Sequence, residues 1–199
     1  MVATTTAGVT CPLGPVRLRI VSSAARGTPP ADLHPTGGAD PWPTDGIGGR
    51  YRVLLVASTG GHLAQLLELR DWWQDLDRVW VTFDKADARS GLAGERVIHA
   101  YHPTTRNLAN AARNLRLAMR VVPDLEPDLV VSAGAGVAVP FFVAARRCRV
   151  PTVYLEVYDR LDSRTLTGRL CRPMSDAFCV QWRDQVSLYP GAELIGPLL

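Results

Sequence analysis

The sequence lacks the motifs of several large protein classes. Its glycine-rich turn after the first predicted strand contains neither G-x-G-x-x-G nor the lysine of a P-loop. Dinucleotide redox chemistry and ATP hydrolysis are therefore disfavoured. The four cysteines lack the spacing of metal ligands, and no other metal-binding cluster replaces them. We expect no metal, and free thiols in a reducing compartment.

Signals for secretion and for crossing a membrane are also missing. Residues 1–14 have neither a basic start nor a continuous apolar core. The uncharged stretch 129–145 is divided by Gly134, Gly136 and Pro140, so it does not predict a membrane-spanning helix. The net charge of +3 is too small to indicate nucleic acid binding.

What is present indicates one folded domain with an extension. The chain has 199 residues, of which 47% are hydrophobic and 21% charged, enough for one domain with a substantial core. Residues 1–49 are rich in Thr, Gly, Pro and Ala and predict a disordered or loosely attached extension, with one possible edge strand at 16–21. A wrongly assigned start codon is an alternative explanation. Residues 50–199 form the predicted domain.

From residue 51 onward, predicted strands and helices alternate. Apolar runs rich in β-branched residues predict strands at 52–57, 78–83, 96–100, 129–132, 150–156, 177–181 and 192–195. Helices are expected at 106–122, where Pro123 would end the helix, and at 137–147, 165–173 and 184–189; residues 84–95 predict a loop or short helix. This alternation predicts an α/β, Rossmann-like fold: a mostly parallel sheet with helices on both faces.

The first strand, turn and helix carry the clearest functional signal. Thr59, Gly60, Gly61 and His62 separate the strand from a helix with leucines at helical spacing. Such a turn lets backbone approach a ligand, and a helix N-terminus offers N–H groups to a phosphate. His62 lies where an imidazole can exchange a proton near neutral pH. The alternative is a turn that only joins two elements.

A second strand, glycine turn and helix follows at residues 129–147, with Gly134 and Gly136 in the turn. The next predicted strand ends at Glu156, and Arg160 comes shortly after it. Ligands of open α/β sheets bind beyond the C-terminal ends of strands, so Glu156 is a candidate site residue. The alternative is a structural carboxylate paired with Arg160 or Arg164.

The predicted helix 106–122 has two distinct faces, and Thr104 or Thr105 is expected to cap it. At 100° per residue, the apolar face holds Leu108, Leu115, Met119 and Val122. The opposite face holds Arg106, Arg113, Arg116 and Arg120. These arginines form either a solvated surface or a patch for anionic lipid headgroups or a diphosphate.

These motifs together resemble a known family. The turn at 59–62 (TGGH) is similar to the glycine loop of MurG-like glycosyltransferases of the GT-B fold. Segments 132–136 (SAGAG) and 154–156 (YLE) are similar to the acceptor-side, membrane-anchoring subunit of split UDP-N-acetylglucosamine transferases. Segments 84–90, 101–107 and 156–160 resemble its bacterial branch, which serves exopolysaccharide or lipopolysaccharide synthesis. The resemblance covers residues 51–199.

The resemblance implies half of a two-chain N-acetylglucosaminyltransferase, the N-terminal half of a GT-B enzyme. One-chain relatives continue from a Gly-x-Pro strand end into a sugar-nucleotide domain, whereas this sequence stops at 195–199 (IGPLL). A separate donor-binding subunit would hold the UDP-sugar, which is a co-substrate, and no cofactor is expected. The acceptor would be a lipid-diphosphate-linked sugar. The eukaryotic relatives have an N-terminal membrane-spanning helix, and this sequence shows no such segment. We therefore expect peripheral association with the cytoplasmic face of the membrane.

The resemblance also implies roles for individual residues. His62 or Glu156 would be the general base, and Arg160 with the helix arginines would contact lipid phosphate. The substrate would be bound by Thr59, Gly60, Gly61, Gly134, Gly136 and Arg160. Two rival interpretations remain: a non-catalytic scaffold that recruits the donor-binding subunit, and a self-sufficient α/β enzyme such as an epimerase-like protein acting on a sugar nucleotide.

Overall fold

The computed structural model describes residues 51–198. The predicted extension 1–49, including its possible strand, lies outside the described residues. Within 51–198, seven strands form one sheet in the order β3-β2-β1-β4-β5-β6-β7, and every strand pair is parallel. The strands are β1 Arg52–Val56, β2 Asp77–Phe83, β3 Val97–Ala100, β4 Leu129–Ser132, β5 Thr152–Leu155, β6 Ala177–Val180 and β7 Glu193–Leu194. The predicted parallel sheet is confirmed.

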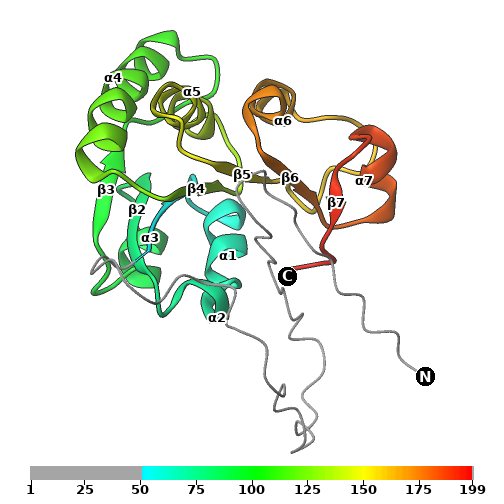
Figure 1. Ribbon diagram of the computed structural model, residues 1–199, viewed down its shortest axis with the longest axis horizontal. Coiled ribbons are helices and arrows are strands. Elements are labelled where there is room, and N and C mark those ends of the chain that lie inside the picture. Colours follow the sequence, from blue (N-terminus) through cyan, green and yellow to red (C-terminus); the bar gives the residue numbers. More distant parts are fainter. Residues whose placement is uncertain (1–50, 199) are drawn as a thin grey trace, which may run out of the picture.

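Helices cover both faces of this sheet, as predicted. Figure 1 shows α4 (Leu108–Leu125), α5 (Ala138–Cys148) and α6 (Leu166–Cys171) on one side. On the other side lie α1 (Gly61–Leu67), α2 (Arg70–Trp73) and α3 (Ala86–Gly91). A 3₁₀ turn at Arg172–Met174 and α7 (Arg183–Leu188) complete the described elements.

The central strands are hydrophobic throughout because both of their faces are covered. Alternate residues of β1 enter separate clusters: Leu54 and Val56 pack in the cluster beneath α4 and α5, and Val53 and Leu55 in the cluster against α1. All four side chains are fully buried. This explains why the sequence shows continuous apolar runs in place of alternation.

Helix α4 differs from the prediction at both ends. Its N-cap is Asn107, whose side chain accepts a hydrogen bond from the Asn110 N–H at 2.9 Å, so the predicted threonine cap is wrong. Pro123 lies inside the helix, which ends at Glu126 in a left-handed conformation. A proline at an exposed position of the last turn removes only one helical hydrogen bond, so the helix continues past it.

The predicted apolar face of α4 is also wrong for three of its four residues. Leu108 is 86% exposed, Leu115 37% and Met119 36%, and only Val122 is buried. The buried face instead includes Asn110 and Asn114. These side chains hydrogen-bond to the loop after β3: Asn110 donates to the Pro103 carbonyl, and Asn114 bonds to both the N–H and the carbonyl of Tyr101. Backbone pairing therefore determines which face is buried.

We expect a reciprocal pair of substitutions to show this inverted face. Asn114→Leu keeps the branched shape of the side chain and leaves the Tyr101 backbone groups without their partner, which costs about 1–3 kcal/mol in the free energy of unfolding. Leu108→Asn, at a highly exposed position, is the control and changes it by less than about 0.5 kcal/mol. Urea denaturation measures both. A larger loss of stability in Leu108→Asn than in Asn114→Leu would contradict this prediction and support the buried face expected from helical periodicity.

Candidate functional site

The loops that follow β1 and β4 lie beside each other at the carboxyl ends of these two central strands. The strand order reverses between these two neighbours, because β1 continues to β2 on one side and β4 to β5 on the other. At such a switch point the connections diverge to opposite faces of the sheet and leave a crevice for ligands. Both glycine turns singled out in the sequence meet there.

His62 connects the two loops. Its Nδ1 lies 2.7 Å from the carbonyl oxygen of Ala133, the first residue after β4. A carbonyl can only accept a hydrogen bond, so Nδ1 carries the proton and the neutral ring keeps Nε2 as an acceptor. The side chain is half-buried and lines a hollow. The geometry therefore fixes one tautomer and leaves the other nitrogen available to take a proton.

Gly134 permits this close contact. Its φ of +104° is strained for residues with a side chain, and an added Cβ would stand 2.9 Å from the Tyr154 hydroxyl and 3.4 Å from the His62 ring. Its N–H donates to the Ser132 hydroxyl at 3.1 Å. At Gly136, an added Cβ would stand 3.0–3.1 Å from the Thr104 side chain. Both glycines thus have packing reasons to be glycine, whichever substrate contacts they make.

The first glycine turn is open on its outer side. Apart from the chain neighbours and the backbone of α1, no atom of residues 51–198 lies within 4 Å of the position that a Cβ would take at Gly60 or Gly61. The Gly60 N–H donates to a carboxylate oxygen of Asp87, on α3, at 2.7 Å. A phosphate at this N–H would have to replace that carboxylate. The outer side of the turn therefore has space for a ligand, while one of its backbone donors is already bonded.

A hollow of about 200 Å³ lies beside His62. Its walls come from the loop after β4, the end of β5, and the segment that joins β5 to α6. The lining residues are His62, Ala135, Tyr154, Glu156, Val157, Asp159, Arg160, Thr165 and Thr167. Arg160, an exposed residue, contributes the cation expected from the sequence. The structure thus brings His62, Glu156 and Arg160 to one place.

Glu156 is fully buried at the base of this hollow. Its carboxylate accepts hydrogen bonds from the Val157 N–H at 3.0 Å, the Thr165 hydroxyl at 3.0–3.1 Å and the Tyr189 hydroxyl. Among the described residues it forms no ion pair with Arg160 or Arg164; Arg164 lies over the Tyr189 ring, 5.7 Å from its centroid. Hydroxyl groups therefore stabilise this carboxylate in place of the arginine that the sequence suggested as its partner.

Burial raises the pKa of Glu156 above its ordinary value, although these three hydrogen bonds and the charge of His62 act in the opposite direction. Desolvation of the Tyr189 hydroxyl, together with the neighbouring Glu156 carboxylate, raises the pKa of Tyr189 to about 12. Tyr154, which packs against the His62 loop, also has its pKa raised, chiefly by burial. These two tyrosines therefore act as neutral hydrogen-bonding groups at neutral pH.

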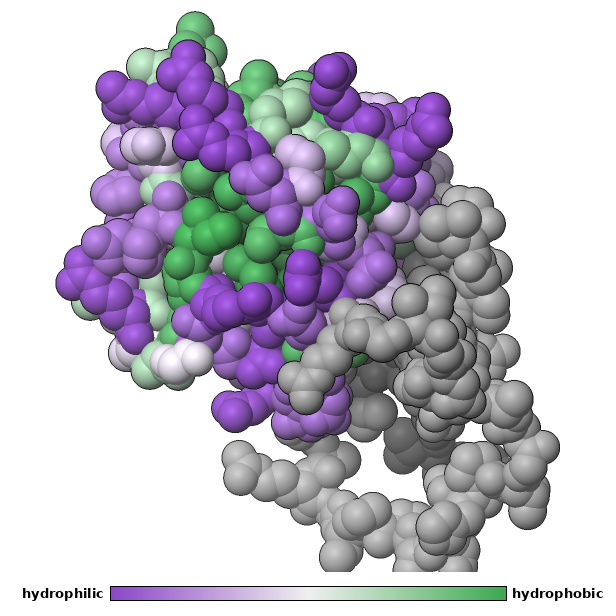
Figure 2. Space-filling model, turned by 60° about the vertical axis from the view of Figure 1, so that its left-hand side comes forward, coloured by the Kyte–Doolittle hydropathy of each residue, from purple (hydrophilic) through white to green (hydrophobic). Residues whose placement is uncertain are grey.

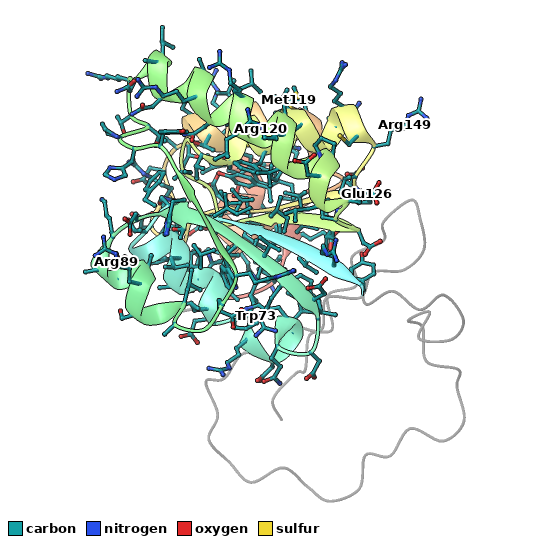
Figure 3. The ribbon with its side chains drawn as sticks, turned by 90° about the vertical axis from the view of Figure 1, so that its left-hand side faces the viewer. Trp73, Arg89, Met119, Arg120, Glu126 and Arg149 are labelled. Atoms are coloured by element: carbon teal, nitrogen blue, oxygen red, sulfur yellow. The ribbon has the colours of Figure 1, made fainter. Side chains whose placement is uncertain are left out.

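The arginines predicted on one helix face do not all lie on α4. Arg106 precedes the helix, in the loop, with φ of +51°. Arg113, Arg116 and Arg120 lie on the exposed part of α4. Figure 3 shows Met119 and Arg120 on the side of α4 that faces away from the sheet. The apolar and basic residues of α4 are therefore neighbours on one exposed surface.

Sequence reasoning missed three residues that shape the hollow: Tyr154, Thr165 and Tyr189. Thr165 caps α6 through its hydroxyl, which accepts from the Gly168 N–H at 2.9 Å, and the same hydroxyl contacts Glu156. The sequence offered one usable signal, a threonine as the first residue of the predicted helix 165–173. Nothing in the sequence indicated that the distant Tyr189 would reach Glu156.

We expect Glu156→Gln to change how stability depends on pH. The raised pKa means that the folded chain binds this proton more tightly than the unfolded chain, so wild-type stability falls as pH rises from about 4.5 through the raised pKa. Glutamine keeps the shape of the side chain and does not ionise. The stability of the variant relative to the wild type should therefore increase as pH rises across this range. Urea denaturation between pH 4.5 and 8 measures the difference. The exposed Glu68→Gln is the control, and equal slopes for Glu156→Gln and wild type would contradict the prediction.

Comparison with known proteins gives a family. A family model described as Oligosaccharide biosynthesis protein Alg14 like matches residues 88–198, more than half of the chain. The UDP-N-acetylglucosamine transferase subunit ALG14 of Eremothecium gossypii is 35% identical over 189 residues, which cover 77% of this chain and 83% of that protein. The ALG14 subunit of Mus musculus is 25% identical over 180 residues, which cover 74% of this chain and 83% of that protein.

The fold is also found among solved structures. MurG of Acinetobacter baumannii superposes with a TM-score of 0.59 at 20% identity, covering 73% of this chain and 45% of MurG. The chain thus spans slightly less than half of that enzyme, and the predicted MurG-like fold is confirmed. The two relatives named above are eukaryotic, so the bacterial branch and its polysaccharides stay a prediction. With the family model and the Eremothecium subunit in agreement, this chain belongs to the Alg14-like family of oligosaccharide biosynthesis proteins.

Proposed function

We propose that this chain is the acceptor-side subunit of a two-chain glycosyltransferase. The enzyme transfers N-acetylglucosamine, or a similar sugar, from a UDP-sugar to a lipid-diphosphate-linked sugar. The observation that carries this proposal is the His62 imidazole, which is held through Nδ1 by the Ala133 carbonyl and lines a hollow large enough for one sugar ring, while Nε2 has no hydrogen-bond partner within residues 51–198. The relatives named above are transferase subunits, which supports a separate partner chain.

In this proposal His62 is the general base. A hydroxyl of the acceptor sugar gives its proton to Nε2 while its oxygen attacks the anomeric carbon of the donor. The bond from that carbon to the UDP oxygen breaks, and UDP leaves with the electron pair. The imidazolium that forms still donates through Nδ1 to the Ala133 carbonyl. The partner subunit holds the UDP-sugar.

Glu156 fits a supporting role better than the role of base. Its oxygens are buried and already accept from three donors, so an acceptor hydroxyl cannot reach them without displacing those groups. In this proposal Arg160, which is exposed on the segment after β5 and lines the hollow, binds a phosphate of the acceptor, and the acceptor enters past Thr59, Gly60 and Gly61.

The second candidate function is a scaffold that recruits the donor-binding subunit and takes no part in the chemistry. The buried, fully bonded state of Glu156 and the packing reasons for Gly134 and Gly136 favour it. The two functions differ in whether His62 touches the reacting hydroxyl.

A transferase assay with this chain and a donor-binding subunit separates the two functions. We expect no turnover of UDP-N-acetylglucosamine by this chain alone, and transfer to a lipid-diphosphate-sugar by the pair. His62→Ala should lower kcat by about 10²–10⁴-fold, since a general base contributes this much. The exposed His99→Ala, on β3, is the matched control and should stay within about threefold of wild type. Near-normal turnover by His62→Ala would contradict the role of His62 as general base and would support the scaffold function.

We also propose that α4 carries the chain to an anionic membrane surface. Within residues 51–198, no helix is long and apolar enough to cross a bilayer. Exposed Leu108, Leu115 and Met119 lie beside Arg116 and Arg120 on this helix. Figure 2 shows hydrophilic and hydrophobic side chains intermixed at the top of the molecule, where α4 lies in Figure 1. Apolar side chains next to cations suit the boundary between headgroups and acyl chains.

Sedimentation with vesicles that contain phosphatidylglycerol tests this surface. Each cation near an anionic membrane contributes about 1 kcal/mol, so Arg116→Glu with Arg120→Glu should weaken binding by about 30-fold or more. The control carries the same change of charge elsewhere, Arg70→Glu with Arg183→Glu, on α2 and α7. Equal loss in both double variants would show attraction by net charge alone and would contradict a site on α4.

A further inference from the structure

Three buried glutamines lie behind the hollow, and the proposed reaction uses none of them. Gln65 on α1, Gln181 after β6 and Gln185 on α7 are each at most 1% exposed. A buried amide without hydrogen bonds costs several kcal/mol relative to water, so such residues persist only where their polar atoms are bonded. The bonds of these three amides run to the two walls of the hollow.

Gln181 joins the wall that carries His62 to the wall that carries Glu156. Its amide nitrogen donates to the Gln65 side-chain oxygen at 2.6 Å and to the Glu156 carbonyl at 2.9 Å. Its side-chain oxygen accepts from the Leu198 N–H at 3.0 Å. Because a backbone donor and a backbone acceptor lie at its two ends, the amide has only one orientation that satisfies both.

Gln65 passes this connection to the glycine turn. Its amide nitrogen donates to the Gly61 carbonyl at 3.2 Å, in the first turn of α1 and one residue before His62. No side chain caps the N-terminus of α1, so this bond is a side-chain restraint on the backbone that carries the imidazole. Helix α1 is only seven residues long, and a short helix depends on tertiary contacts for its position.

Gln185 holds the opposite wall. Its amide nitrogen donates to the Val157 carbonyl at 2.6 Å and to the Arg160 carbonyl at 3.1 Å, at two points in the first part of the segment after β5. Its oxygen accepts from the backbone N–H groups of Gln181 and Trp182 at 2.9 and 3.1 Å. The two walls are therefore bonded to the same short stretch after β6.

We propose that Gln181 is a positioning residue that sets His62 against the segment after β5, so that the base and Arg160 face one substrate. This inference rests on the proposed function. An apolar residue of the same volume would fill the core at this position without the desolvation cost of an amide. The amide instead specifies one distance between two elements that the sheet alone does not join, since α1 and the end of β5 belong to different crossovers. Catalysis depends on such distances, because a displacement of about 1 Å lowers turnover by about 100-fold.

The first measurement needs only this chain. Nitrogen-15 NMR of the imidazole reports which ring nitrogen carries the proton, and in the wild type we expect the Nδ1–H tautomer held by Ala133. Gln181→Met keeps the volume and removes both donors, so the His62 resonances should shift toward those of the Nε2–H form. The exposed Gln74→Met is the matched control and should leave them unchanged. Unchanged resonances in a folded Gln181→Met would overturn the proposal.

The second measurement uses the pair of subunits. Gln181→Met should lower kcat by about 10- to 100-fold while KM for the UDP-sugar stays within about threefold, since the partner binds the donor. Two results would overturn the positioning role in the reaction. One is a loss of kcat/KM that comes equally from a raised KM for the UDP-sugar, and the other is an unchanged kcat despite shifted His62 resonances. If the wild-type pair is inactive, the proposed function fails, and the NMR result still decides whether Gln181 positions His62.

Gln65→Met is the second variant, in case Gln181→Met does not fold. It breaks the same connection at its other end and leaves the Gln181 bond to the Glu156 carbonyl in place. We expect the same direction of shift in the His62 resonances. A folded Gln65→Met with wild-type resonances would also count against the proposal.

Discussion

The pairing of β1 with β4 is the constraint on which the candidate site depends. These strands are parallel neighbours in register from Val53 with Leu129 to Val56 with Ser132. Two loops that are about seventy residues apart in the chain therefore leave the sheet side by side, and His62 reaches the Ala133 carbonyl across a single hydrogen bond. Were the strand order different, neither loop would hold an imidazole in one tautomer. The chemistry proposed for the site follows from this adjacency.

Polar groups buried behind the site add to what the sheet provides. Parallel strands position loops only approximately, because the loops themselves have few mutual contacts. Here a carboxylate and several amides bond to groups from different crossovers: Glu156 to the Thr165 hydroxyl at the start of α6, Asn114 to the backbone of the loop after β3, and Gln181 to two walls of the hollow. Each bond is expensive to lose once buried, and each fixes one loop relative to the sheet.

The same use of polar groups decides what α4 presents to its surroundings. Because Asn110 and Asn114 turn inward to satisfy loop backbone, Leu108, Leu115 and Met119 turn outward beside arginines. Side chains that helical periodicity would place in the core are therefore exposed, and these are the side chains of the proposed membrane contact. The loop contacts and the outer surface are thus two consequences of one rotation of the helix.

The sequence by itself determined the order and type of most elements, the parallel sheet and the positions of both glycine turns. These follow from local signals: apolar runs of β-branched residues, glycines between strand and helix, and the strict alternation of the two. It also singled out His62, Glu156 and Arg160, because residues at the C-terminal ends of parallel strands converge.

Only the tertiary structure decided which of these groups are free to act. The state of Glu156 depends on Tyr189, thirty-three residues away, and the orientation of α4 depends on backbone groups of a loop, which no periodicity encodes. The bonds of Gln181 join α1, the end of β5 and the backbone at Leu198, three elements brought together only by the sheet order. Hydrophobic pattern is a local property of the chain, whereas the satisfaction of a buried polar atom depends on what the fold places beside it.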